Sequence, residues 1–199
     1  MLVSTFMGAV TTLQTGANLV SPFVPRFIIS NVVREMTILE LAPTIMAVIY
    51  AGKVGSSMAG GLGTMRITEQ IDALEVMGIN AASYLVLPKI VASVLMYPLL
   101  VIVAAVCALM GGYLVGTLTG LLTPTEYVYG IRYAFNPYFI TFALIKTFVF
   151  AFLISTISSF KGYYTQGGAL EVGIASTQAV TSSIIAILLA DYFLAYLLI

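Results

Sequence analysis

The sequence contains no histidine and no tryptophan, and only 8% of its 199 residues are charged. Histidine is the most frequent general base and metal ligand near neutral pH, so its absence removes the commonest chemistry of both kinds. The net charge is zero, so the basic surface that binds nucleic acid is also missing. The single cysteine, Cys107, cannot form an intrachain disulfide, and we interpret it as a packing residue.

Hydrophobic residues are abundant instead, at 60% of the chain. A helix needs about 20 apolar residues to cross a bilayer, and a charge at its centre costs about 2.5–3.5 kcal/mol. The apolar stretches therefore predict five membrane spans, at residues 1–20, 40–59, 85–114, 138–160 and 172–198. The first stretch lacks the basic region and cleavage site of a signal peptide, so we interpret it as part of a span. The predicted fold is all-α: a polytopic membrane helix bundle of about five spans in a single transmembrane domain, residues 1–199.

The longest uncharged run covers residues 90–125. As one helix it would reach about 54 Å, well beyond a hydrocarbon core of about 30 Å, so it must bend or end. The places we expect are its glycines: Gly111, Gly112, Gly116 and Gly120. After them we predict a looser, non-cytoplasmic link that reaches Asn136 and Pro137.

Charged residues inside spans usually face the bundle interior or a cavity and take a partner of opposite charge. Glu40 and Lys146 are therefore candidates for a structural ion pair or for a headgroup or proton-relay role, and the sequence leaves open whether the two meet. Asp191, in the last predicted span, is interpreted as a helix-end or packing polar group.

The segment from residue 64 to residue 80 is the most polar part of the chain. It contains four charged residues within ten positions: Arg66, Glu69, Asp72 and Glu75. We predict a helix of about ten residues here, capped by Thr68 and closed by Gly78 in a left-handed conformation. One face would carry Ile67, Ile71 and Leu74, which recur at helical spacing. At about 15 Å, the helix is too short to cross a membrane.

Two interpretations of this short helix are open. In the first, the helix contacts a soluble ATPase at the ends of the spans and transmits the movement of that subunit to them. In the second, it is a solvated link without a partner. Its side of the membrane carries more of the basic residues, so the positive-inside rule makes that side cytoplasmic. The four on this side are Lys53, Arg66, Lys89 and Lys161, against Arg26, Arg34 and Arg132 on the other.

The residues around the helix carry a specific pattern. Residues 72–88, DALEVMGINAASYLVLP, have the outline of the EAA loop of ABC importers. More closely, residues 40–92 resemble the MlaE-like permease family of Mla/Mce-type lipid ABC transporters. The matching motifs are E-L-A-P at the entry to the second span, then A-G-K-V-G-S, G-T-M-R-I-T-E-Q-I-D-A-L-E-V-M and the pair Pro88-Lys89.

The resemblance implies a function in the bacterial inner membrane, as a multi-pass, non-catalytic permease without a cofactor. Its partners would be an ABC ATPase subunit, an MCE-domain protein, a second permease copy and membrane lipids. Contact with the ATPase would involve Glu69, Gln70, Asp72, Ala73, Leu74 and Met77. Glu40 and Lys146 would lie near the lipid cavity between two copies.

The chain departs from the family pattern at several places. It is shorter at the N-terminus than the family. Gly61 stands where the family commonly has glutamate, and Leu39 precedes Glu40 where some members have arginine. Ile174 and Gln178 replace basic residues that some members carry in the last span.

Three other functions remain as alternatives. A membrane-embedded enzyme would need a nucleophile with a base, or paired acids, and the span carboxylates Glu40 and Asp191 lie on different helices. A channel or ATPase-independent transporter would explain charges in the spans but not the pattern of the polar helix. A small-solute ABC importer would use a solute-binding protein instead of an MCE-domain partner. The chain has no phosphate-binding loop, so ATP hydrolysis would reside on another subunit.

Overall fold

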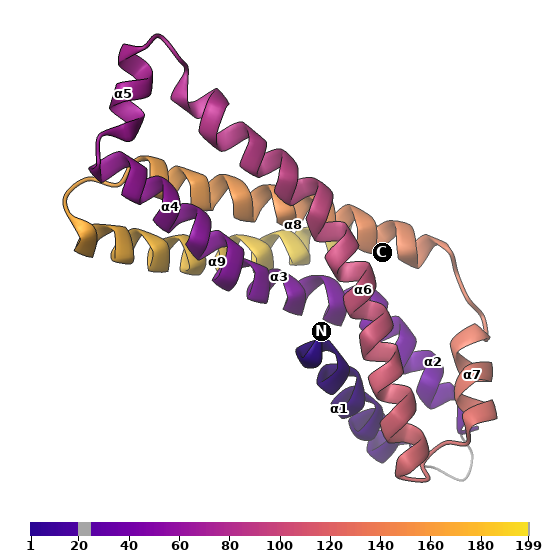
Figure 1. Ribbon diagram of the computed structural model, residues 1–199. Coiled ribbons are helices and arrows are strands. Elements are labelled where there is room, and N and C mark those ends of the chain that lie inside the picture. The colour runs from indigo at the N-terminus through magenta and orange to yellow at the C-terminus, as the bar shows by residue number, and fades with distance from the viewer. Residues whose placement is uncertain (20–24, 199) are drawn as a thin grey trace. The chain divides into compact units, whose positions relative to one another are not determined.

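The computed structural model describes residues 1–19 and 25–198, and every regular element in these ranges is a helix. Figure 1 shows their order along the chain. The elements are α1 (Leu2–Leu19), α2 (Phe27–Met36), η1 (Thr37–Ile45), α3 (Met46–Tyr50), η2 (Ala51–Gly55), α4 (Ser56–Ile67), α5 (Gln70–Val76), η3 (Ala82–Val86), α6 (Leu87–Leu118), α7 (Pro124–Arg132), α8 (Tyr138–Tyr163) and α9 (Ala169–Leu198). The three η segments are π-helical. The prediction of an all-helical fold is confirmed for the described residues.

Within residues 1–19 and 25–198, three helices are long and apolar enough to cross a bilayer: Ala82–Leu118, Tyr138–Tyr163 and Ala169–Leu197. They contain the spans predicted at residues 85–114 and 138–160, and the span predicted at 172–198 as far as Leu197. The stretch predicted at 1–20 forms α1 up to Leu19, and Val20 lies outside the described residues. Residues 40–59 lie in the continuous helical run from η1 to α4. That these two stretches also cross the membrane stays a prediction.

The contacts group the chain into two compact units, which are described separately. Unit 1 comprises Met1–Ile45 and Leu99–Ile145, and unit 2 comprises Met46–Pro98 and Lys146–Ile199. The single transmembrane domain over residues 1–199 stays a prediction.

In unit 1, glycines bring α1 against α6. A Cβ atom on Gly8 would overlap the carbonyl of Ala108, and one on Gly111 would overlap the carbonyl of Thr5. Small residues let two helix backbones approach this closely, which is how helices associate where lipid removes the hydrophobic driving force. The helix therefore continues through Gly111 and ends at Leu118, two residues before Gly120, whose φ of +69° is left-handed.

We expect Gly8→Ala to lower the free energy of unfolding by about 1–3 kcal/mol, because the added methyl group overpacks the contact with Ala108. Gly52→Ala is the matched control, since a Cβ there meets no atom within 4 Å. That substitution should be neutral or stabilising by up to about 1 kcal/mol. Equilibrium unfolding in detergent micelles measures both, and equal effects would contradict the close α1–α6 packing.

The link predicted to be loose contains helix α7. Thr123 caps it: the Thr123 hydroxyl accepts a hydrogen bond from the Glu126 amide at 3.3 Å, and the Thr123 amide donates to the Glu126 carboxylate at 2.8 Å. These bonds hold the pKa of Glu126 below its usual value. The prediction of a loose link was wrong because the capping box Thr-Pro-Thr-Glu, with Pro124 at the first helical position, overrides the lack of a long apolar pattern.

Helix α2 is fixed to α7 by a buried arginine. Arg34 is 1% exposed, and its guanidinium donates to the carbonyls of Ile131 at 2.7 Å and Tyr133 at 2.9 Å. It also pairs with Glu35 at 3.0 Å and lies over the Phe135 ring, 5.5 Å from its centroid. The apolar cluster beside it consists of Ile29, Val33, Leu122 and Tyr127. Arg34 therefore satisfies the carbonyl groups at the C-terminal end of α7.

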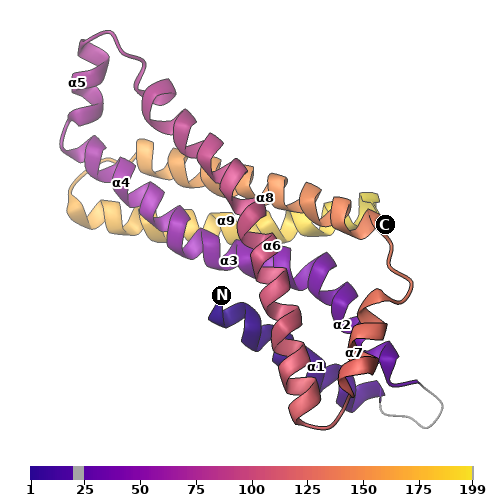
Figure 2. The same ribbon diagram turned by 45° about the vertical axis from the view of Figure 1, so that its right-hand side comes forward.

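In unit 2, helices α4 and α9 pack side by side, and α8 lies against α4 (Figure 1, Figure 2). A Cβ atom on Gly162 of α8 would overlap the carbonyl of Ala59 in α4. On the α9 side, Gly63 lies against Val172. Helices α4, α8 and α9 therefore pack together, and α5 follows α4 at one end of the unit.

Candidate functional site

Helix α5 joins α4 to η3 and α6 at one end of unit 2, turned away from the direction of α4 (Figure 1, Figure 2). It has seven residues, where about ten were predicted. The predicted cap Thr68 was wrong: Glu69 takes that position at a φ of 59°, and no side chain caps the helix. Thr68 instead donates to the Thr64 carbonyl at 2.8 Å, because α4 continues to Ile67 and keeps Thr68 in its last turn.

The C-terminal end of α5 is the predicted one. Gly78 has a φ of +77°. The Gly78 amide donates to the Glu75 carbonyl and the Ile79 amide to the Leu74 carbonyl, each at 3.0 Å. This pair of bonds is a Schellman motif, which ends a helix at a left-handed glycine.

Helix α5 has one packed side and one free side. Ile71 is fully buried, which agrees with the apolar face predicted for it. Glu69, Ala73 and Met77, spaced four residues apart, form a row that is exposed along its length. We call these three residues the outer row. The remaining residues proposed for ATPase contact lie beside it, with Gln70 exposed and Asp72 and Leu74 partly buried.

Two polar contacts fix α5 to its neighbours. Arg66 at the end of α4 pairs with Asp72 at 2.7 Å, and its guanidinium lies 5.9 Å from the centroid of the Tyr163 ring. Tyr163, the last residue of α8, donates to the Glu75 carboxylate at 2.8 Å. A displacement of α5 would therefore act on α4 and α8 directly. Sequence reasoning missed Tyr163, which is 88 residues from Glu75 and carries no local signal.

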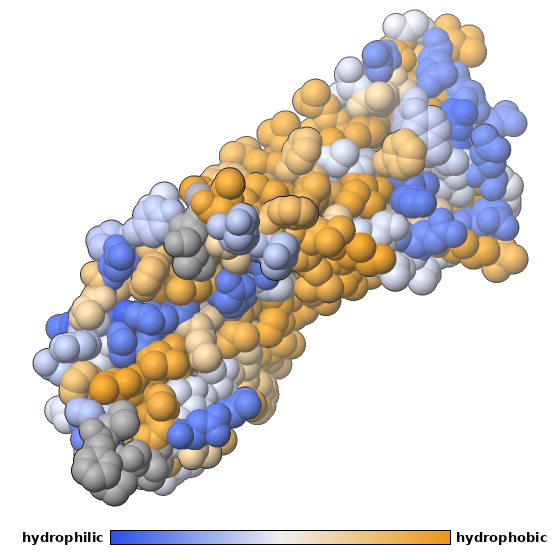
Figure 3. All heavy atoms as spheres, turned by 180° about the vertical axis from the view of Figure 1, so that it is seen from behind, coloured by the Kyte–Doolittle hydropathy of each residue, from blue (hydrophilic) through white to orange (hydrophobic). Residues whose placement is uncertain are grey.

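Polar side chains gather at this end of unit 2, and an apolar surface covers the helices next to it (Figure 3). Such a division is typical of a helical protein whose polar end lies in water and whose spans lie in lipid.

An ion pair connects the last two helices, α8 and α9. The Lys146 ammonium of α8 is fully buried and lies 2.7 Å from the carboxylate of Asp191 in α9. The interpretation of Asp191 as a helix-end or packing group was therefore wrong, since it is the partner of a buried charge. Partner choice across two helices depends on their packing, which no local pattern in the sequence contains.

Glu40 lies in the π-helical segment η1 of unit 1, and its side chain is partly buried. Pro43 falls inside the same segment. A proline has no amide hydrogen and its ring clashes with the carbonyl four residues earlier, so the widened turn accommodates it. Lys146 belongs to unit 2. The lipid cavity proposed near these two residues stays a prediction.

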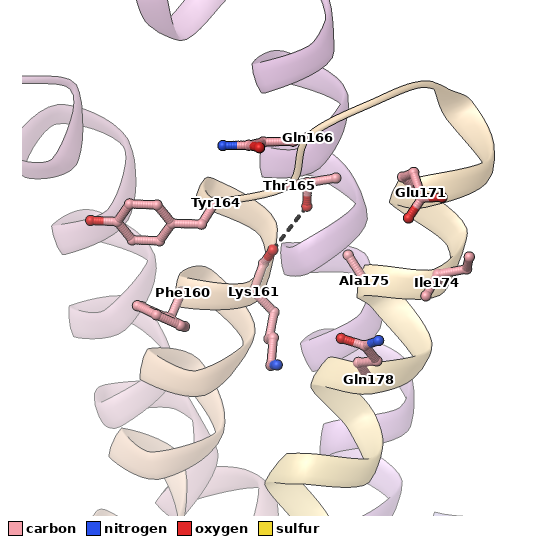
Figure 4. Close-up of a pocket in the computed structure, with 9 residues that line it drawn as sticks. All are labelled: Phe160, Lys161, Tyr164, Thr165, Gln166, Glu171, Ile174, Ala175 and Gln178. Carbon is pink, nitrogen blue, oxygen red and sulfur yellow. Dashed lines mark hydrogen bonds between the residues drawn. The ribbon is translucent and has the colours of Figure 1, made fainter.

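A pocket of about 260 Å³ lies at the link between α8 and α9. Lys161 of α8 and Gln178 of α9 project into it, and Glu171 lies in the first turn of α9 (Figure 4). Thr165 donates to the Lys161 carbonyl at 2.8 Å, which closes the end of α8. Because an ammonium and a carboxylate both line the pocket, it does not select an ion of one sign. Gln178, one of the departures from the family pattern, lies here.

The three membrane-length helices and the exposed helix α5 at the polar end of unit 2 together define the class, which is a helical membrane protein. Comparison of the sequence with known families identifies the family. The family described as "Permease MlaE" matches residues 1–197, and the chain belongs to this family.

Relatives in three groups of organisms agree with this assignment. A probable ABC transporter permease of Rickettsia bellii is 39% identical, over 95% of this chain and 73% of the relative. A second protein of that description, from Synechocystis, is 32% identical over 100% of this chain and 75% of its own length. The chloroplast protein TRIGALACTOSYLDIACYLGLYCEROL 1 of Arabidopsis thaliana is 35% identical over 98% of this chain and 55% of its own length. The chain is thus an ABC transporter permease of the MlaE family.

Proposed function

We propose that this chain is the membrane subunit of an ATP-driven (phospho)lipid transporter in the bacterial inner membrane. It would move lipid between that membrane and an MCE-type periplasmic partner, while a separate ATPase subunit hydrolyses ATP. The outer row of α5 carries the proposal, because it is an exposed acid–small–apolar row on a helix fixed to two long helices. A lipid cargo is supported by the name of the Arabidopsis relative, which is that of a glycosylated diacylglycerol.

The ATPase would contact Glu69, Ala73 and Met77, and its movement would displace α5. The Arg66–Asp72 pair would transmit it to α4, and the Tyr163–Glu75 hydrogen bond would transmit it to α8. Because helices pack as rigid bodies, a shift of α4 and α8 moves whole spans rather than single side chains. A lipid cavity between two permease copies, proposed to lie near Glu40 and Lys146, would open and close in this way.

A homodimer is part of the proposal, and α9 supports it. Gly173, Thr177 and Thr181 are exposed and spaced four residues apart on this membrane-length helix. Small side chains let two helices approach closely in a bilayer, and hydroxyl side chains can form hydrogen bonds between helices that lipid tails cannot offer.

Ala73→Arg tests the ATPase contact. The substitution places a long cation at the centre of the outer row, and we expect the recovery of the ATPase subunit by co-purification to fall at least about tenfold. Membrane insertion should be unchanged, because Ala73 is exposed. Co-purification from detergent extracts, with the permease quantified in the same sample, measures the loss.

Two controls accompany this variant. Ala73→Ser keeps the side chain small and should retain the ATPase. Gln166→Arg adds the same charge at an exposed position of the α8–α9 link, and should also retain it. Equal losses in Ala73→Arg and Gln166→Arg, or full recovery with Ala73→Arg, would contradict the assignment of the contact to α5.

A further inference from the structure

A second pocket in unit 2, of about 430 Å³, lies between two segments of the chain. One wall comes from the end of α3, η2 and the start of α4, and the other comes from the first turns of α6. Each wall contributes one lysine, Lys53 and Lys89. We call it the lysine pocket.

The lysine pocket has cations and no carboxylate. No aspartate or glutamate lines it, and in residues 1–19 and 25–198 no acidic side chain pairs with either lysine. Gly61 lies beside Lys89, and a Cβ atom there would be 4.0 Å from the Lys89 ammonium. The absence of a side chain at this position keeps the approach to Lys89 open. Two ammonium groups in one pocket repel each other and favour an anion between them.

Other lining residues give the pocket a fixed polar part and an apolar part. The Tyr50 hydroxyl lies 3.0 Å from that of Ser93, and both residues are buried. Val54 and Met96 add apolar surface, and Met96 is 64% exposed. Leu95, its neighbour on α6, is 60% exposed. An anion with an apolar tail would fit this combination.

The position of the pocket along the chain agrees with such a ligand. Lys89 lies seven residues from the start of the membrane-length helix Ala82–Leu118, which is about 10 Å at 1.5 Å per residue. A lysine near the end of a span extends its ammonium to the headgroup region, where lipid phosphates lie. An ammonium binds phosphate as a compact charge with three hydrogen-bond donors.

We propose that the lysine pocket binds the phosphate group of a membrane phospholipid between Lys53 and Lys89, with the acyl chains along the exposed apolar residues of α6. This site goes beyond the proposed transport function. It shares no residue with the outer row of α5, with Glu40 or with Lys146, and binding requires neither the ATPase nor lipid movement.

The test uses the chain of residues 1–199, delipidated in a non-ionic maltoside detergent and titrated by calorimetry. Three probes separate the sources of binding: dioctanoylphosphatidylglycerol, dioctanoylglycerol without the phosphate, and inorganic phosphate. We expect only the first to bind at low concentration. Lys53→Gln with Lys89→Gln should weaken its binding at least about tenfold, because both charge-assisted hydrogen bonds are lost.

Gly61→Glu gives a second variant that keeps both lysines. Its carboxylate would lie beside Lys89 and occupy the place of the phosphate, so binding should again fall about tenfold. Gly61→Gln is the control of matched size, and it should weaken binding less than Gly61→Glu, because it narrows the approach to Lys89 without adding a negative charge. Lys161→Gln removes a charge from a different pocket and should have no effect. Thermal unfolding of each variant verifies that it is folded.

Several outcomes would overturn the proposal. Equal binding of dioctanoylglycerol would mean recognition of the acyl chains alone. Competition by inorganic phosphate at equal concentration would mean a site for the free anion. Equal weakening by Lys161→Gln would mean general attraction by charge, and unchanged binding in Gly61→Glu would remove Lys89 from the site. Loss of ATPase co-purification in Ala73→Arg is independent of all four, so the two proposals fail separately.

Discussion

Replacement of Asp191 by alanine is expected to lower the free energy of unfolding by about 3–5 kcal/mol, the range found when one partner of a buried ion pair is removed. The ammonium of Lys146 is fully buried and would lose the carboxylate that lies 2.7 Å away. A buried ammonium carries a large desolvation cost that a carboxylate at this distance offsets. Equilibrium unfolding in mixed micelles gives the free energy directly.

The double variant Lys146→Met, Asp191→Leu separates the cost of an orphaned charge from the contribution of the pair. Because removing both charges removes both desolvation penalties, the double variant should unfold within about 1–2 kcal/mol of the natural chain, on either side. Asp191→Asn should fall between the natural chain and Asp191→Ala, since the amide still accepts a hydrogen bond. A double variant less stable than Asp191→Ala would contradict this account.

Local patterns in the sequence predicted several elements. Apolar length and the scarcity of charge predicted the three helices that can cross a bilayer. Helical spacing predicted the burial of Ile71, and glycine chemistry predicted the left-handed end at Gly78. In each case the physical cause acts within a few residues of the chain, so it is visible in a single sequence.

Other features depend on packing between distant segments. Asp191 meets Lys146, and Tyr163 meets Glu75, only because α8 lies against its neighbours. Thr68 has the chemistry of a cap but stays in the last turn of α4, since the extension of that helix outweighs a single capping bond. The capping box at Thr123 differs from these, because its signal, Thr-Pro-Thr-Glu, is local and is visible in the sequence.

The same distinction between local and distant partners decides what Arg34 does. Glu35 is its neighbour in sequence, yet the side chain of Glu35 is 36% exposed, so water weakens its attraction to the buried Arg34 guanidinium. The carbonyls of Ile131 and Tyr133 come from a different helix end and have Arg34 as donor. The stabilising part of the interaction should therefore be the contact with α7 rather than the salt bridge.

Arg34→Met is accordingly expected to lower the free energy of unfolding by about 3 kcal/mol or more, since two hydrogen bonds from a charged donor, each contributing about 1.5–3 kcal/mol, are lost while the apolar stem is kept. Arg34→Lys should lose about half as much, because a single ammonium cannot reproduce the planar fork. Glu35→Gln should change stability by less than about 1 kcal/mol. Hydrogen exchange of α7 amides should quicken in Arg34→Met, and an effect as large in Glu35→Gln would assign the stabilisation to the salt bridge instead.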